Sequence, residues 1–239
     1  MKVIEAKWEK RNLGVLAYEI SVEEEDTLID IKTTLDRLVA EYTVVKIPTY
    51  RTELLFETNS LGLTFVEMVT KCHYTGRAPA LNGIHGRLIE SLSCQEISPA
   101  NQMNLFVEVG NGLFKADRVA IDPDFGIAKS SARYVGWIKD EVDLGARIFE
   151  VTKGFEFVGF FLMRRIDLGR SISNLAGLIG KFQNSGMGYA LNYFEIEKSS
   201  SMGANSVIST FSSNNRGASA IHMSMGYVLD SQNYVYIRH

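Results

Sequence analysis

A six-residue segment, Gln183-Asn184-Ser185-Gly186-Met187-Gly188, has the composition of a backbone loop that binds phosphate. It follows an apolar run at 172–178 and precedes a segment at 189–201 whose apolar residues recur at helical spacing. At such a helix start, free N–H groups and the positive end of the helix dipole favour an anion. Gly186 and Gly188 have no Cβ that would keep a pyrophosphate away from the backbone. The spacing indicates a diphosphate site, and the alternative is a strand-to-helix turn that binds no ligand.

A second motif follows another apolar run, at 207–211. Asn215, Ala218, His222, Gly226 and Tyr227 form the pattern N-x-x-A-x-x-x-H-x-x-x-G-Y. Offsets of three and four place the first three of them on one face of a short helix. Gly226 is positioned to end that helix before a last strand. Asn215 either fixes local backbone or a cofactor amide, or serves only as the helix N-cap.

In this order the two motifs resemble those of the GCN5-related N-acetyltransferase family. The resemblance implies that the loop at 183–188 binds the pyrophosphate of acetyl-CoA and that the later helix lies beside the pantetheine arm. It also implies that the strand at 171–178 splays from its neighbour, which exposes backbone to the pantetheine amides and an oxyanion donor near 175–178. The implied cofactor contacts are Leu178, Gln183, Asn184, Ser185, Gly186, Met187, Gly188, Asn215 and Ala218.

The family resemblance places the proton donor for the departing CoA thiolate at His222, where the usual residue is a tyrosine. Histidine donates protons near neutral pH, so the role can survive the replacement. The alternative is a packed and hydrogen-bonded histidine, with Ser219, Ser224 or water as the donor. No general base stands out, and a water chain is an alternative to the three carboxylates near the expected pocket, Glu156, Asp167 and Glu108.

Several further segments resemble the bacterial TDP-fucosamine acetyltransferase group, which acetylates the 4-amino group of a nucleotide-linked deoxysugar. They are Trp8-Glu9 with Gly14, Asp122-Pro123 followed by Tyr134 and Trp137, and the ending at 233–238. The resemblance implies that Tyr134 and Trp137 form a wall of the acceptor pocket and that Arg118 or Arg133 contacts the diphosphate. The alternatives are an aromatic pair in the core and plain surface arginines.

The composition favours an ordinary cytoplasmic enzyme, with 239 residues, 46% apolar, 22% charged and a net charge of −3. No basic cluster could neutralise a series of phosphates, so we expect no nucleic-acid partner. No apolar stretch reaches the roughly twenty residues that span a bilayer, and no signal peptide is recognisable, so we expect no membrane association. The cysteines and histidines have no metal-site spacing, so we expect reduced thiols and no metal at Cys72, Cys94, His73, His85 and His239.

The chain divides into three predicted segments: 1–75, a linker at 76–114 with one short helix around Arg87 to Ser93, and 115–239. In the first we expect strands at 15–22, 43–48 and 64–74 and helices at 27–41 and 51–60. In the last we expect helices at 132–142 and 189–201 and strands at 146–152, 156–164, 171–178 and 207–211. The helix-to-strand turns at 59–65 and 224–228 are alike, which suggests that the first segment is a partial copy without CoA; a chance likeness is the alternative.

The expected fold is therefore mixed α/β (α+β), with a mostly antiparallel central sheet flanked by helices and a smaller N-terminal α/β segment. The expected function is acetyl transfer from acetyl-CoA to a small-molecule primary amine, preferably the 4-amino group of a nucleotide-linked deoxysugar. The alternatives are another amine, such as a peptide N-terminus or an antibiotic, and a non-catalytic acyl-CoA-binding protein. A homodimer is left open.

Overall fold

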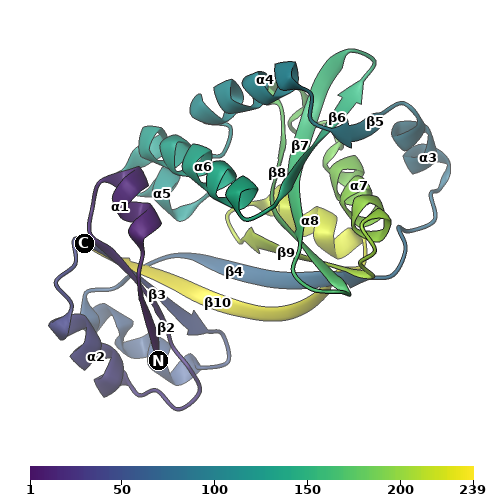
Figure 1. The fold of residues 1–239 in the computed structure, drawn as a ribbon. Helices are drawn as coiled ribbons and strands as arrows, with labels where there is room; N and C mark the ends of the chain where they lie inside the picture. The colour runs from purple at the N-terminus through teal and green to yellow at the C-terminus, as the bar shows by residue number, and fades with distance from the viewer.

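One ten-stranded sheet runs through the whole computed structural model, which describes residues 1–239 (Figure 1). Its strand order is β1-β2-β3-β10-β4-β9-β8-β7-β6-β5. Only β2–β3 and β8–β9 are parallel pairs. The strands are β1 Lys2–Glu5, β2 Ala17–Ser21, β3 Tyr42–Pro48, β4 Thr64–Thr75, β5 Ser93–Glu96, β6 Arg147–Lys153, β7 Glu156–Arg165, β8 Arg170–Leu178, β9 Ser206–Ser212 and β10 Val228–Arg238. The predicted mixed α/β fold with a mostly antiparallel sheet is confirmed.

Helices cover both faces of the C-terminal half of this sheet. On β7, Phe160 and Leu162 pack with α4 and α6, whereas the alternate residues Phe161 and Met163 pack with α7. No helix is long and apolar enough to cross a membrane. The helices are α1 Lys7–Leu13, α2 Leu28–Arg37, α3 Gly83–Glu90, α4 Pro99–Gly110, α5 Arg118–Ile121, α6 Gly126–Asp143, α7 Gly188–Ser201 and α8 Arg216–Ser224, with the 3-10 helices η1 Thr52–Leu61 and η2 Gly180–Phe182.

The N-terminal half repeats one unit of the C-terminal half. In β2–α2–β3, as in β8–α7–β9, two parallel strands are joined by a helix, which fits the expected partial copy. The last strand, β10, lies between β3 and β4 and pairs antiparallel with both. The two halves therefore share one sheet across the predicted domain division, and that division remains an interpretation.

The prediction that 76–114 is a linker with one short helix is wrong. This segment contains α3, the edge strand β5, which pairs with β6, and α4, which packs against α6 through the buried Leu105 and Val109. Ser98 caps α4 and Pro99 occupies its first turn, a helix-start signal that the prediction missed. Strand β5 could not be recognised, because its residues are polar and partly exposed.

Candidate functional site

Strands β8 and β9 form a fork. They pair in parallel from Arg170↔Ser206 to Ser173↔Ser209 and no further. A register shift follows in β8, which continues to Leu178 paired with β7 alone, while β9 continues to Ser212 paired with β4. The amide of Ile179 donates to the Val158 carbonyl on the β7 side, so alternation along the strand turns the amides of Ala176 and Leu178 toward the open fork. The splay implied by the sequence resemblance is present, and it leaves unpaired backbone at the end of β8.

The loop between β8 and α7 presents free N–H groups at the open end of the fork. Neither Asn184 nor Gly186 donates its amide to any acceptor, and Gly188, the first residue of α7, has no acceptor within its helix. Asn184 and Gly186 are left-handed, at φ 59° and 80°. A Cβ at Gly186 would meet nothing within 4 Å, so the space before it is open. This arrangement of amides at a helix start suits a diphosphate.

The other loop residues hold the loop in place. The Gln183 side-chain amide donates to the Leu178 carbonyl at 3.4 Å, and the Ser185 hydroxyl donates to the Phe182 carbonyl. Gly188 also has a packing role: a Cβ at this position would lie 2.3 Å from Ile221 Cδ1 on α8. The sequence did not predict this contact. Met187 is the residue before α7 and packs partly against the core below the fork.

His222 is buried, and both ring nitrogens have partners. Nδ1 lies 2.8 Å from the Ala218 carbonyl and Nε2 lies 2.9 Å from Ser209 Oγ. A carbonyl only accepts, so Nδ1 carries the proton and neutral Nε2 accepts from the serine. Burial lowers the pKa of His222 from its ordinary 6.5, and the bond to Ala218 opposes this only in part. Asn215 caps α8, because its side chain accepts from the Ala218 amide at 3.1 Å.

A second buried titratable group lies below the fork. Glu195 on α7 is 2% exposed, and one of its carboxyl oxygens has no partner. Burial raises the pKa of Glu195 to about 8, and the Ser173 hydroxyl opposes the shift. The Tyr227 hydroxyl nearby is also buried without a partner. Sequence reasoning missed Glu195, although its place four residues after Leu191 puts a carboxyl on the apolar face of the predicted helix.

The residues expected to contact the acceptor lie on the other face of the sheet. Tyr134 is 8% exposed, its ring centroid lies 4.4 Å from that of Phe114, and it stacks on Trp137 at 5.8 Å. Phe114 also covers Gly177 of β8, where a Cβ would come within 3.1 Å of its ring. Tyr134 is thus a core residue, and Trp137 is partly buried beside it.

Arg118 and Arg133 are engaged in a buried ion cluster. Both donate to the Glu9 carboxylate, Arg118 at 3.1 Å and Arg133 at 2.8 Å, and Glu9 is 1% exposed. The cluster joins α1, α5 and α6, and breaking it would leave an uncompensated buried charge. A diphosphate would have to compete with Glu9 for either arginine.

Three of the other candidate groups, Glu156, Asp167 and Ser224, have local partners. Lys181 pairs with Glu156, and Arg170 pairs with Asp167, which holds the pKa of that carboxyl below its ordinary value. Glu108 makes no ion pair. Ser224 donates to the Ile221 carbonyl of its own helix.

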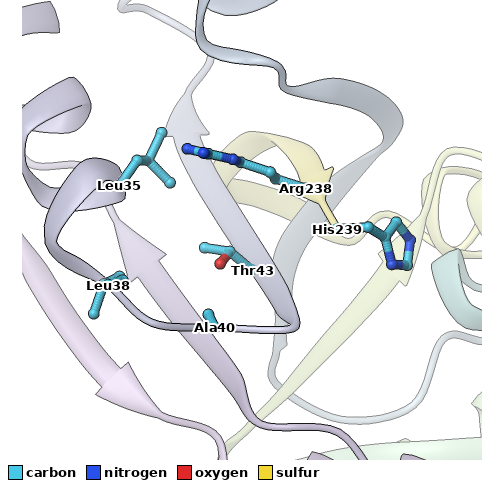
Figure 2. A pocket seen from close by; sticks show the side chains of 6 residues that line it. All are labelled: Leu35, Leu38, Ala40, Thr43, Arg238 and His239. Atoms are coloured by element: carbon cyan, nitrogen blue, oxygen red, sulfur yellow. The ribbon is translucent and has the colours of Figure 1, made fainter.

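The structure brings together one group of potential metal ligands, Asp122, Asp124 and His239. His239 Nε2 lies 3.0 Å from Asp122, and the Asp124 amide donates to the same carboxylate. The three residues thus form hydrogen bonds and ion pairs with one another. A hollow of about 80 Å³ beside His239, lined also by Leu35, Leu38, Ala40, Thr43 and Arg238, lies in the N-terminal half (Figure 2). Thr43, in the wall of this hollow, belongs to β3, and strands β10 and β4 lie between β3 and β9 in the sheet. The hollow is therefore separate from the fork.

No family model and no curated protein matches the chain. Solved structures do match. The GCN5-related N-acetyltransferase from Sphaerobacter thermophilus is 14% identical, with a TM-score of 0.63, over 99% of this chain and 75% of that one. A GCN5-related N-acetyltransferase from Kribbella flavida is 11% identical, with a TM-score of 0.55, over 93% of this chain and 81% of that one.

A third match is the GCN5-related glucosamine N-acetyltransferase region of a fungal multi-domain GH3 beta-N-acetylglucosaminidase. It is 10% identical, with a TM-score of 0.59, over 82% of this chain and 25% of that one. The chain therefore has the fold of GCN5-related N-acetyltransferases. The TDP-fucosamine subgroup finds no support among these structures.

Proposed function

We propose that this protein transfers an acetyl group from acetyl-CoA to a primary amine. The observation that carries the proposal is the continuity of two features: the fork between β8 and β9 opens directly onto the free amides of Asn184, Gly186 and Gly188. A diphosphate at those amides places the attached pantetheine arm in line with the unpaired edge of β8. The fold shared with known acetyltransferases supports this assignment.

The chemistry needs three things from the chain. The amine must lose a proton as it attacks the thioester, the tetrahedral oxyanion needs a hydrogen-bond donor, and the CoA thiolate needs a proton. Ala176 and Leu178 offer fork-facing amides for the cofactor amides and for the oxyanion. His222 is the candidate for proton transfer, and its only route outward from the ring runs through Ser209.

The acceptor we propose is the 4-amino group of a nucleotide-linked deoxysugar. Its support is the sequence resemblance of Trp8, Asp122-Pro123 and Trp137, and a glucosamine N-acetyltransferase region among the similar folds. We assign the aromatic contact to Trp137 and count Tyr134 and Arg118 as structural supports of that wall. A peptide N-terminus or an antibiotic amine is the competing acceptor. The two free cysteines fit a reducing cytoplasmic compartment, and a homodimer stays open.

The first prediction tests the cofactor site at Gly186. Gly186→Glu puts a negative charge against the diphosphate, while Gly186→Gln has nearly the same size and the same strain at φ 80° without the charge. We expect calorimetry to show acetyl-CoA affinity at least about tenfold weaker for the Glu variant than for the Gln variant, which corresponds to about 1.4 kcal/mol. Equal affinities in two folded variants would contradict the site.

Acceptor choice is tested in the same preparation. The wild-type protein should acetylate a dTDP- or UDP-linked 4-amino-4,6-dideoxyhexose with a much higher kcat/KM than a peptide N-terminus or an aminoglycoside. If peptides are preferred, the sugar assignment is wrong and the acetyl-CoA site stands. If acetyl-CoA binds and no amine is acetylated, the protein is an acyl-CoA-binding protein.

A further inference from the structure

Two serines face each other at the vertex of the fork. Ser173 and Ser209 are the last paired residues of β8 and β9, and each is buried. The Ser209 hydroxyl lies 2.9 Å from His222 Nε2, and the Ser173 hydroxyl is beside the Glu195 carboxyl. The vertex therefore carries two similar hydroxyls. Only the Ser209 hydroxyl is hydrogen-bonded to a base, His222, that can accept its proton at neutral pH.

The surroundings of His222 keep its ring neutral and oriented. The Ala218 carbonyl holds the proton on Nδ1, and the ring packs against Phe211 at 5.0 Å and Tyr227 at 4.7 Å. The titratable groups of the packed elements are Tyr227 itself, Glu195 on α7 and Cys72 on β4, which bonds to the Ser209 carbonyl at 3.7 Å. His222 forms no ion pair with any of them. Its free lone pair at Nε2 points to Ser209.

The position of Ser209 in the fork relates it to the reacting end of the cofactor. The free amides of the phosphate loop lie at the open end, beyond Leu178. A pantetheine arm that enters from there advances along β8 toward Ser173 and Ser209, so its thioester is the part that comes closest to the vertex. This step rests on the proposed function.

We propose that Ser209 and His222 form a proton relay for acetyl transfer. As the amine attacks the thioester carbon, the proton of the acceptor nitrogen passes to Ser209 Oγ, and the hydroxyl's own proton passes to His222 Nε2. When the C–S bond breaks, the proton on Nε2 returns to Ser209 and the hydroxyl proton passes to the CoA sulfur. The net change is one proton moved from nitrogen to sulfur, and both residues end as they began. One pair thus supplies both the base and the acid of the reaction.

The test compares Ser209→Ala, His222→Gln and the double variant with Ser173→Ala, which removes the matched hydroxyl across the vertex. Each relay variant should lose roughly 10²-fold in kcat, the scale of general acid–base catalysis, and the double variant no more than either alone. Ser209→Thr, which keeps a hydroxyl, should recover most of the loss. Acetyl-CoA affinity should change less than threefold throughout, and Ser173→Ala should stay within threefold of wild-type kcat.

A pH profile separates the relay from a packing role. The ratio of wild-type to His222→Gln kcat cancels the titration of the acceptor amine, and it should fall as the pH drops through the pKa of His222, below 6.5. Nitrogen NMR of the ring should show the neutral Nδ1–H tautomer at pH 7. A ratio independent of pH, additive losses, or the Nε2–H tautomer would overturn the relay. Full activity of Ser209→Ala would overturn the relay alone, whereas an inactive wild type would overturn the proposed function with it.

Discussion

Glu195 is a carboxyl group buried without a cation. Its folded pKa of about 8 lies above the ordinary 4.5, so between these values the folded state holds a proton that the unfolded state has released. The neutral carboxyl therefore makes its full contribution to the free energy of unfolding below about pH 4.5, and this contribution is lost as the pH rises toward 8. The buried oxygen without a partner adds to this cost, since an ionised Glu195 would lack compensating donors.

We predict that Glu195→Gln removes this pH dependence. Urea unfolding should show that the free energy of unfolding of the wild type falls by about 2 kcal/mol between pH 6.5 and 8.5, and that the variant changes much less. Glu197→Gln is the matched control, because Glu197 is exposed on the same helix, and it should behave as the wild type. A wild type equally stable at both pH values would show that Glu195 has a compensating partner.

For single residues, the sequence predicted the features that depend on local backbone conformation. The Gly186 loop and the Asn215 cap were found because glycine and asparagine have local conformational preferences. The pairing of His222 with Ser209 and the burial of Glu195 were not found, because each depends on how α7 and α8 pack on the sheet. The pairing of Arg118 with Glu9 was missed for the same reason, since 109 residues separate the partners.

Helices α7 and α8 approach each other closely at Gly188. The side chain of Ile221 occupies the place of the missing Cβ, 2.3 Å from where that atom would be. Helices packed this closely fix the angle at which α7 begins, and the start of α7 orients the free amides of the loop. Gly188 therefore influences the orientation of these amides through packing.

We predict that Gly188→Ala destabilises the protein by about 1–3 kcal/mol, the usual cost of overpacking, and weakens acetyl-CoA binding. Adding Ile221→Ala should restore part of both, because the second change removes the colliding atoms. Gly180→Ala serves as the control, since a Cβ at Gly180 meets nothing within 4 Å. If Gly188→Ala costs no more than Gly180→Ala in urea unfolding and calorimetry, the packing account fails.

Element prediction succeeded where apolar periodicity was strong and failed where it was not. Helix α7 was predicted within one residue of its observed start, and the expected strands of the C-terminal half were all found. Strand β1 and helix α1 were not predicted. The segment predicted as a helix at 51–60 is the 3-10 helix η1, because hydrophobic spacing over so short a stretch does not distinguish the two.

The two halves of the chain differ in the loops that precede their corresponding helices, α2 and α7. In the N-terminal half, the loop before α2 carries Glu23 to Asp26, and Arg51 donates to the carbonyls of Glu23, Glu24 and Asp26 at 2.6–2.7 Å. The Met1 ammonium pairs with two acidic side chains of the same loop. Strands β2 and β3 stay paired along all of β2. The chain therefore has one fork, between β8 and β9, that opens onto a loop with free backbone amides.

The most direct test of the account is amide hydrogen exchange with and without acetyl-CoA. We predict slower exchange at Ala176, Leu178, Asn184 and Gly186 when the cofactor is bound, because the first two amides face the fork and the other two lie without acceptors in the loop before α7. Exchange at 23–27 in the N-terminal half should not change. Protection confined to the N-terminal half, or no protection at the fork at saturating acetyl-CoA, would contradict the assignment of this fork as the cofactor site.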